Sequence, residues 1–456
     1  MFGLNKEQKE AVGLLSVGTF LEYFDLLLYV HMAVLLNELF FPKFDPHTTS
    51  ILSSMAFCST FIFRPVGALI FGWIGDNIGR KSTVIITTML MAVSCVTMAN
   101  LPTYEEIGIT ATWVLLICRI VQGMSSMGEI NGAEIYLTES IKPPAQYSAV
   151  TLIESFAAMG GMVALAIASI AALYKFNWRI AFWIGALIAL IGMIARTRLR
   201  ETPDFVDMKL KMKKAIELES GAEVAKKFFK DPNNPMKKEK VKKMTALALF
   251  LMDCSWPVWF YLAFIYCGNI LKDSFGYTPE QVIHQNLIVG ITELLGVLPL
   301  VYLSYKIYPL IILKIKAVIF SVFILFCPYL LNNVTTPFEL LLIQCFIMFF
   351  VLDTVPGVAI FYKHFPIFKR FTSVSLLYSL SRAFMYVITS FGFIYLNDHF
   401  GHWGLLIIML PVIIAYIFGL YYFDGLEKEN KALLASSKNA FLEKFGSAET
   451  TLEKIH

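Results

Sequence analysis

Apolar stretches of about 20 residues recur along the whole chain, and few charged residues interrupt them. A helix of this length crosses the roughly 30 Å of hydrocarbon in a bilayer. Charged residues make up 16% of the 456 positions, whereas soluble proteins carry about 25%. The sequence therefore predicts an all-α membrane protein with twelve transmembrane helices, near 12–37, 50–74, 83–101, 109–130, 147–173, 178–196, 244–271, 281–304, 311–332, 337–361, 371–396 and 403–423.

The distribution of lysine and arginine sets the expected orientation. Basic residues gather in alternate connections between the predicted helices, at Arg80 and Lys81, Lys142, 306–316 and 363–370. Because short cytoplasmic loops are enriched in Lys and Arg, these connections are expected in the cytoplasm. An even number of spans then places both termini there.

One long polar segment, 197–243, separates the apolar stretches into two sets of six. The expected units are a six-helix bundle at 1–196, a basic cytoplasmic linker at 197–243, a second six-helix bundle at 244–424 and a short cytoplasmic tail at 425–456. Secondary transporters are often built from two such bundles, with the substrate site between them near the membrane midplane. The linker is either a basic amphipathic helix on anionic lipid headgroups or a solvated connection, and both interpretations stay open.

Several classes of protein are disfavoured by what the sequence lacks. It has no Gly-rich phosphate-binding loop and no H-E-x-x-H motif, so we expect neither an enzyme nor a cofactor. The seven cysteines form no C-x-x-C pair and lie mostly in apolar stretches, where they are expected to pack rather than to bind a metal. The first stretch is too long for a signal peptide and contains acidic residues. The net charge of +4 reflects the cytoplasmic loops and not nucleic-acid binding, and we expect a monomer.

A polar decapeptide at 72–81, Gly-Trp-Ile-Gly-Asp-Asn-Ile-Gly-Arg-Lys, lies between the second and third apolar stretches. Its glycines allow close helix approach and positive φ, and its charges place opposite signs at one membrane face. With an acidic residue at the end of the fourth stretch, they are expected to close a cytoplasmic gate: Gly72, Asp76, Gly79, Arg80, Lys81 and Glu139. The alternative is a turn whose charges merely orient the chain.

The decapeptide resembles the loop between helices 2 and 3 of the major facilitator superfamily, G-x-x-x-D-x-x-G-R-[RK]. Other segments are similar to one branch of it, the metabolite:proton symporters, which include proline/glycine-betaine, shikimate and α-ketoglutarate transporters. These segments are Phe20-Leu-Glu-Tyr-Phe-Asp25, Arg64-Pro65, Arg119-Ile-Val-Gln-Gly123, Gly128-Glu129, Arg198-Leu-Arg-Glu-Thr-Pro203, Phe365-Pro366, Arg370 and Tyr378 with Arg382-Ala383. The resemblance implies the major facilitator fold and a multi-pass transporter of a bacterial inner membrane.

The chain also departs from the family pattern at three places. Asn77 and Gln146 stand where basic residues are usual, and the second-half copy of the loop, near 303–311, lacks its Asp and Gly. The cytoplasmic latch is therefore expected to be complete in the first half and reduced in the second.

Two acidic residues, Glu22 and Asp25, lie three positions apart in the first apolar stretch, hence on one helical face. Charged residues inside a membrane usually mark a functional site. Two carboxylates that are close in a desolvated cavity repel, so one is expected to bind and release a proton near neutral pH. We therefore expect Asp25 or Glu22 to carry a coupled proton. The alternative is that one of them pairs with an arginine or caps a helix bend.

Polar residues form a stripe along the fourth predicted helix, at Arg119, Gln122, Ser126 and Glu129. This spacing fits a water-lined cavity better than lipid. Since guanidinium binds carboxylate in a bidentate manner, Arg119 is expected to hold either the carboxylate of a substrate or that of Asp25. A structural ion pair within the first half is the alternative.

The second half supplies further charges inside predicted helices: Asp253, Glu293, Asp353 and Arg382. The resemblance implies that helices 1, 4, 7 and 10 line the cavity, which ranks the two aspartates above the glutamate. Glu134 and Glu154 in the first half rank lower. Trp256 is expected either to stack on an ammonium group or simply to pack. The expected substrate-binding set is Arg64, Arg119, Gln122, Glu129, Asp253, Trp256, Asp353 and Arg382, with the role of Arg64 open.

Together these features predict a proton-driven importer of a small polar organic solute, either a zwitterion such as an amino acid or betaine, or an organic acid. Two other functions stay open: an exchanger or exporter of the same fold, and a membrane sensor that binds without transport. The fifth stretch contains Gly160-Gly161 but lacks the Gly-Pro pair that antiporters often carry, which disfavours exchange.

Overall fold

A computed structural model of the protein describes residues 3–41, 60–174, 178–196 and 240–452. Within these ranges the chain forms helices and no strands. The first half contains α1 (Lys6–Phe40), α3 (Arg64–Asn77), α4 (Arg80–Asn100), α5 (Tyr104–Ile107), α6 (Ile109–Ser140), α7 (Ala145–Tyr174) and α8 (Trp178–Arg196). The second half contains α11 (Lys243–Asp253), α12 (Ser255–Phe260), the π-helix η1 (Tyr261–Tyr266), α13 (Cys267–Phe275), α14 (Pro279–Lys306), α15 (Pro309–Asn332), α16 (Pro337–Phe349), α17 (Val358–Lys363), α18 (Ile367–Phe400), the 3₁₀-helix η2 (Gly401–Leu405) and α19 (Leu406–Leu452).

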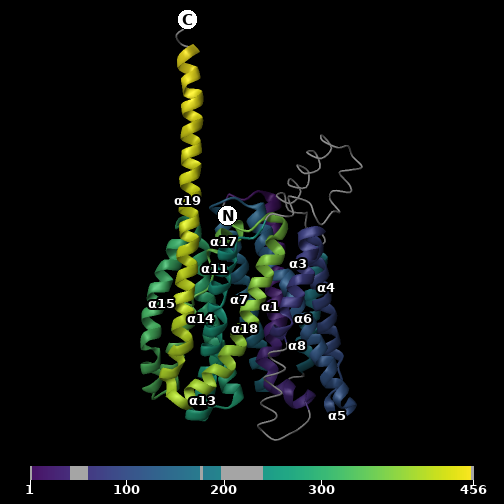
Figure 1. The fold of residues 1–456 in the computed structure, drawn as a ribbon. Helices are drawn as coiled ribbons and strands as arrows, with labels where there is room; N and C mark the ends of the chain where they lie inside the picture. Colours follow the sequence, from purple (N-terminus) through teal and green to yellow (C-terminus); the bar gives the residue numbers. More distant parts are fainter. Residues whose placement is uncertain (1–2, 42–59, 175–177, 197–239, 453–456) are drawn as a thin grey trace.

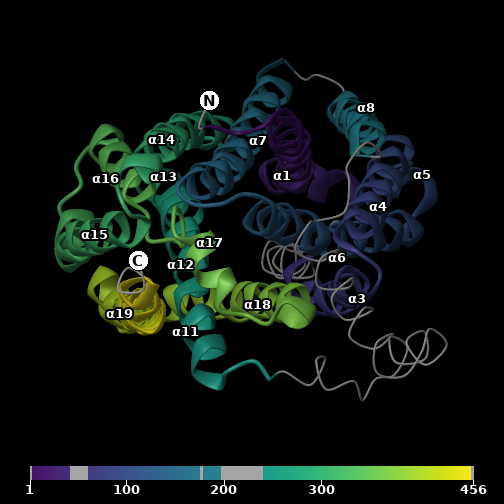
Figure 2. The ribbon, with the colours of Figure 1, turned by 90° about the horizontal axis from the view of Figure 1, so that it is seen from above.

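The helices gather in two groups, which correspond to the two halves of the chain (Figure 2). The groups are joined most extensively by α7 packing against α14 and by α3 packing against α18, and α17 and α18 also contact α6. Within the first group, α1 packs against α7 and α4 packs against α8. Most of the predicted linker, 197–239, lies outside the described residues, so its association with anionic lipid stays a prediction.

The described helices include eight stretches that are long and apolar enough to cross a membrane, and α16 is a shorter apolar helix. The all-helical, membrane-spanning class is therefore confirmed, while the count of twelve spans stays a prediction. Helix α1 begins, and α19 ends, at the same face (Figure 1). That this face is cytoplasmic also stays a prediction. The expected boundary between 424 and 425 falls inside α19, so the tail continues a helix as far as Leu452.

Local sequence explains where α14 and α16 begin. Each starts at a proline that follows a threonine, Thr278 or Thr336. The threonine hydroxyl accepts a hydrogen bond from the backbone N–H three residues later, and the side chain at that later position accepts one from the threonine N–H. Proline suits the first helical position because its missing N–H would have no partner there.

The predicted spanning helix at 244–271 corresponds to one apolar span, Lys243–Phe275, which is interrupted at Cys254. Helix α11 ends at Asp253 and α12 begins at Ser255. Pro257 has no N–H to donate to the carbonyl oxygen of Asp253, four residues earlier. Arg382 of α18 donates to this carbonyl instead, with an Nη1–O distance of 3.0 Å.

The predicted single helix at 337–361 is interrupted too. Helix α16 ends at Phe349, and α17 begins only at Val358, directly after Pro356 and Gly357. A proline disfavours helical backbone at the residue before it. The second interruption therefore places Asp353 beside non-helical backbone, whereas Asp253 precedes Cys254, whose φ of −65° and ψ of −16° stay helical. Discontinuous helices of this kind commonly build the binding sites of transporters.

Close contact between α1 and α7 depends on a glycine, which gives a first prediction. A Cβ at Gly160 would lie 2.2 Å from the carbonyl oxygen of Phe20, whereas a Cβ at Gly13 meets nothing within 4 Å. We expect Gly160→Ala to destabilise the detergent-solubilised protein by about 1–3 kcal/mol through overpacking. Thermal unfolding followed by circular dichroism would measure this. Gly13→Ala is the matched control and should be neutral or slightly stabilising; equal midpoints for the two variants would contradict the prediction.

Candidate functional site

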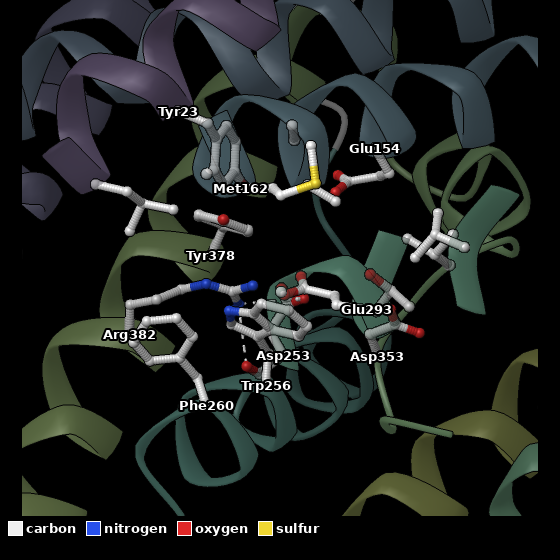
Figure 3. A pocket seen from close by; sticks show the side chains of 18 of the residues that line it. Tyr23, Glu154, Met162, Asp253, Trp256, Phe260, Glu293, Asp353, Tyr378 and Arg382 are labelled. Atoms are coloured by element: carbon white, nitrogen blue, oxygen red, sulfur yellow. Dashed lines mark hydrogen bonds and ion pairs between the residues drawn. The ribbon is translucent and has the colours of Figure 1, made fainter. Parts of the chain in front are cut away.

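A cavity lies between the two halves (Figure 3). Residues of α1, α6 and α7 line it from the first half, and residues of α11, α12, α14, α17 and α18 line it from the second. Its charged lining consists of five carboxyl groups and one guanidinium: Glu134, Glu154, Asp253, Glu293, Asp353 and Arg382. The structure thus brings together four residues of the predicted substrate set, Asp253, Trp256, Asp353 and Arg382.

Arg382 is held on three sides. Its Nη1 lies 3.7 Å from Oδ1 of Asp253, and it also donates to the carbonyl oxygen of the same residue. Its guanidinium carbon lies 3.5 Å from the centre of the Tyr378 ring. Figure 3 shows Tyr378 between Tyr23 and Arg382. The arginine is therefore a preorganised, half-neutralised cation at the break between α11 and α12.

Asp353 is neutralised by a lysine. Nζ of Lys316, on α15, lies 2.9 Å from Oδ1 of Asp353, and both side chains are nearly buried. The hydroxyl of Tyr416 donates to the Asp353 carbonyl at 2.7 Å, which satisfies a backbone group freed by the helix break. Lys316 was counted as a loop charge from the sequence, and that assignment was wrong, since the residue lies inside α15.

Glu293, ranked below the two aspartates from the sequence, lines the same cavity from α14. Glu134 and Glu154 also line it, although the sequence ranked them lower. The Tyr362 hydroxyl donates to Oε2 of Glu134 at 2.8 Å, across the boundary between the halves. The cavity lining therefore carries an excess of acidic groups beyond those that Arg382 and Lys316 neutralise.

Aromatic rings line one side of the cavity. Trp256, Phe260 and Phe264 follow one another along the α12–η1 segment, with ring centroids 6.2 Å and 4.9 Å apart. A smaller adjoining cavity contains Arg64, whose guanidinium carbon lies 4.6 Å from the centre of the Phe61 ring. Arg64 thus lies next to the main cavity and does not line it.

The remaining predicted residues of the first half lie elsewhere. Glu22, Asp25, Arg119 and Gln122 are each at most 1% exposed, and none lines the main cavity. Arg119 donates to Gln122 at 2.9 Å, and Oδ1 of Asp25 lies 2.1 Å from where a Cβ of Gly185 would be. These groups are buried inside the first bundle. The side chain of Glu129 lies outside the described part of the structure. The functional roles of these five residues stay predictions: Glu22, Asp25, Arg119, Gln122 and Glu129.

At one end of the cavity, the predicted gate residues meet the start of α18. The Asp76 carboxylate accepts hydrogen bonds from the N–H of Phe371 at 3.2 Å and the N–H of Thr372 at 2.8 Å. It also accepts one from the Thr372 hydroxyl at 2.6 Å. Glu139 pairs with Arg370 at 3.0 Å, and both side chains are buried. The second half therefore contributes to this contact through α18 and not through a copy of the decapeptide.

The glycines of the decapeptide make this contact possible. A Cβ at Gly72 would lie 2.7 Å from the Thr372 Cα, so a larger residue would separate α3 from α18. Gly79 has a φ of 149°, which favours glycine. Lys81 is half-buried, and the side chain of Arg80 lies outside the described part of the structure. The gating role of this set stays a prediction.

Sequence reasoning missed several residues of the site. Tyr362 and Thr372 are ordinary helix residues in the sequence, and only the packing of distant segments gives them partners. Tyr378 was named as part of the family pattern, but its stacking with Arg382 was not predicted. Lys316 did carry a signal, because a lysine inside an apolar stretch needs a buried acidic partner.

Comparison with known proteins identifies the fold. The sequence profile of the Major Facilitator Superfamily matches residues 15–361. The chain belongs to this superfamily. Superfamily members are multi-pass membrane transporters and not enzymes, as the sequence predicted.

Relatives with curated descriptions are transport proteins of bacteria. The chain is 37% identical over 206 residues to a putative metabolite transport protein of Haemophilus influenzae. The matched segment covers 43% of this chain and 46% of that protein. It is 34% identical over 205 residues to the proline/betaine transporter of Escherichia coli K12. This match covers 43% of this chain and 41% of that protein. The matched segments thus span less than half the length of these relatives.

Solved structures share the superfamily fold. A proton:xylose symporter bound to 6-bromo-6-deoxy-D-glucose superposes with a TM-score of 0.74 at 14% identity, over 91% of this chain and 96% of that chain. The human organic anion transporter MFSD10 superposes with a TM-score of 0.68 at 14% identity, over 91% of this chain and all of that one. At this identity the likeness concerns the fold alone.

Proposed function

We propose that this protein is a secondary active transporter of a bacterial inner membrane, which imports a small polar organic solute by proton symport through alternating access. The observation that carries the proposal is the cavity between the halves, which faces a contact of Asp76 and Glu139 with α18 at one end. A contact that can open while the opposite end closes is what rocking of two bundles requires. A monomer suffices, because both halves of the cavity come from one chain.

The lining favours a solute with an ammonium group. Five carboxyl groups face one guanidinium in the cavity, and that guanidinium already contacts Asp253. A positive group on the solute would relieve this excess of negative charge, and the aromatic rings beside it suit cation–π contact. A zwitterion such as an amino acid or betaine fits best, with its carboxylate near Arg382. The named function of the E. coli relative, a proline/betaine transporter, agrees with this class.

Uptake into proteoliposomes tests the proposal. Radiolabelled proline and glycine betaine serve as probes, with an inward pH gradient imposed or absent. We expect the gradient to drive accumulation of at least one probe. Counterflow that ignores the gradient would indicate an exchanger instead, and binding without flux would indicate a sensor. Accumulation of shikimate or α-ketoglutarate, but of neither zwitterion, would contradict the solute class.

The role of Trp256 gives a second prediction. If its ring contacts the ammonium group of the solute, its loss removes a cation–π contact of about 0.5–2 kcal/mol. We expect Trp256→Ala to raise the KM for uptake by roughly 2- to 30-fold with a smaller change in maximal rate. The matched control is Trp113→Ala, since Trp113 lies on the surface of α6 with 61% exposure. Equal KM values for the two variants would show that Trp256 only packs.

A further inference from the structure

Two glutamates of the first half form a pair at the edge of the cavity. Glu134 on α6 and Glu154 on α7 both line it, and their carboxyl groups lie close to each other. Two carboxylates that lie close together in a desolvated site repel each other, so the pair favours a proton on one of them. The pair can therefore hold one proton on one carboxyl group, and the other carboxyl group can bind a second proton.

The charged surroundings do not neutralise the pair. Groups that face it from other elements are Tyr23 on α1, Asp253 on α11, Glu293 on α14, Asp353 between α16 and α17, Tyr362 on α17, and Tyr378 and Arg382 on α18. Arg382, the one cation among these groups, already contacts Asp253. Lys316, the cation nearest Asp353, is paired with Asp353 itself. The negative charge of the pair is therefore reduced most directly by protonation.

A second observation marks the same place. Asn131 lies one helical turn before Glu134 on α6, is fully buried, and its Nδ2 has no acceptor among the described residues. A buried donor without an acceptor is costly and points to a state in which an acceptor comes to it. Residues three apart on a helix are neighbours, so an ionised Glu134 is the nearest candidate.

Tyr362 connects this pair to the gate. Its hydroxyl donates to Glu134 across the two halves. It belongs to α17, which ends at Lys363, only seven residues before Arg370 of the gate contact. A hydrogen bond to an ionised carboxylate is about twice as strong as one to a neutral group. Protonation of Glu134 therefore weakens a contact that holds α6 against α17.

We propose that the Glu134–Glu154 pair carries the coupling proton and that Tyr362 transmits its charge state to the gate. This rests on the proposed proton symport. A proton from outside binds Glu134, the member of the pair that Tyr362 contacts, which loosens this contact and favours opening of the gate. The same proton then leaves to the more alkaline cytoplasm, and the restored carboxylate draws Tyr362 back. Asp25 and Glu22, buried away from the cavity, then have a structural role.

Infrared spectroscopy of the purified protein tests the proton site without any solute. The difference spectrum between acidic and alkaline pH should contain a protonated-carboxyl band that disappears in both Glu134→Gln and Glu154→Gln, while Asp25→Asn retains it. Glu154→Asp, which keeps a carboxyl group, should retain a shifted band, and elution profiles check that each variant is folded. Persistence of the band in both glutamine variants, or its loss in Asp25→Asn, would overturn the proposal.

Transmission to the gate needs its own readout. Ser375 on α18 is fully buried beyond the gate contact, so the alkylation rate of Ser375→Cys reports opening. We expect acidic pH to increase this rate, and Tyr362→Phe to remove the pH dependence while the infrared band remains. A pH dependence unchanged by Tyr362→Phe would overturn the role of Tyr362. The infrared band and the alkylation rate are both measured without solute. If both behave as expected but the wild type shows no proton-driven uptake, the proposed function fails and the proton site does not.

Discussion

Arg382→Ala is expected to reduce solute uptake into proteoliposomes about 30-fold or more, because losing the arginine that is proposed to bind the solute carboxylate costs about 2–5 kcal/mol of affinity. The variant would leave the Asp253 carboxylate without its cation and the Asp253 carbonyl without the donor that replaces Pro257. Tyr378 would lose the guanidinium that stacks on it. Arg382→Lys should fall between the wild type and the alanine variant, since an ammonium group cannot reproduce the planar fork.

A double variant separates charge from geometry in this prediction. Asp253→Asn combined with Arg382→Gln removes both charges, so it should recover most of the thermal stability that Arg382→Ala loses, though not the uptake. Initial uptake rates and thermal unfolding midpoints of the same preparations provide the measurement. Uptake by Arg382→Ala within tenfold of the wild type would show that the arginine is dispensable for the site.

The fold was largely predictable from the sequence because a bilayer leaves so few options. Apolar length alone indicates helices, since every backbone N–H and C=O must be satisfied inside the spanning segment. The interruption after Phe349 was not predicted, although Pro356 was visible in the sequence. Proline inside a spanning helix is tolerated when another element takes over the freed carbonyl. Here Arg382 bonds the carbonyl that Pro257 frees, and Tyr416 bonds the Asp353 carbonyl within the second interruption; neither partner is evident from sequence spacing.

The site was predicted in part. Asp253, Asp353 and Arg382 stood out as charges within apolar stretches, and the structure places them around one cavity. Arg119 and Asp25 stood out for the same reason but lie inside the first bundle. Sequence gives the helical face that a charge occupies, not whether this face meets the partner half or a neighbour in its own bundle. Glu134 and Glu154 gained importance only from their mutual contact and from Tyr362, 228 residues away from Glu134 in the chain.

Asp76→Ala is expected to shift the protein toward the state in which the gate is open. The Asp76 carboxylate accepts three hydrogen bonds from Phe371 and Thr372, which tie α3 to α18. Hydrogen bonds to a charged group contribute about 1.5–3 kcal/mol, so the open population should rise roughly 10- to 100-fold. If the gate opens rarely and closes faster than the reagent reacts, the alkylation rate of Ser375→Cys is proportional to the open population. The rate should therefore rise by the same factor as that population. Net uptake should fall, because a transporter that stays open to one side completes fewer cycles.

The controls for the gate come from the same surface. Asn77→Ala changes the next residue, whose amide donates to Trp73 within its own helix, and should leave the alkylation rate near that of the wild type. Lys306→Cys, at the exposed end of α14, should be alkylated equally fast in all backgrounds because it is accessible in either state. Gly72→Val should behave like Asp76→Ala, since its side chain would enter the space of Thr372. If Asp76→Ala leaves the labelling of Ser375→Cys unchanged while Gly72→Val accelerates it, close packing of α3 on α18 holds the gate, and the carboxylate of Asp76 does not.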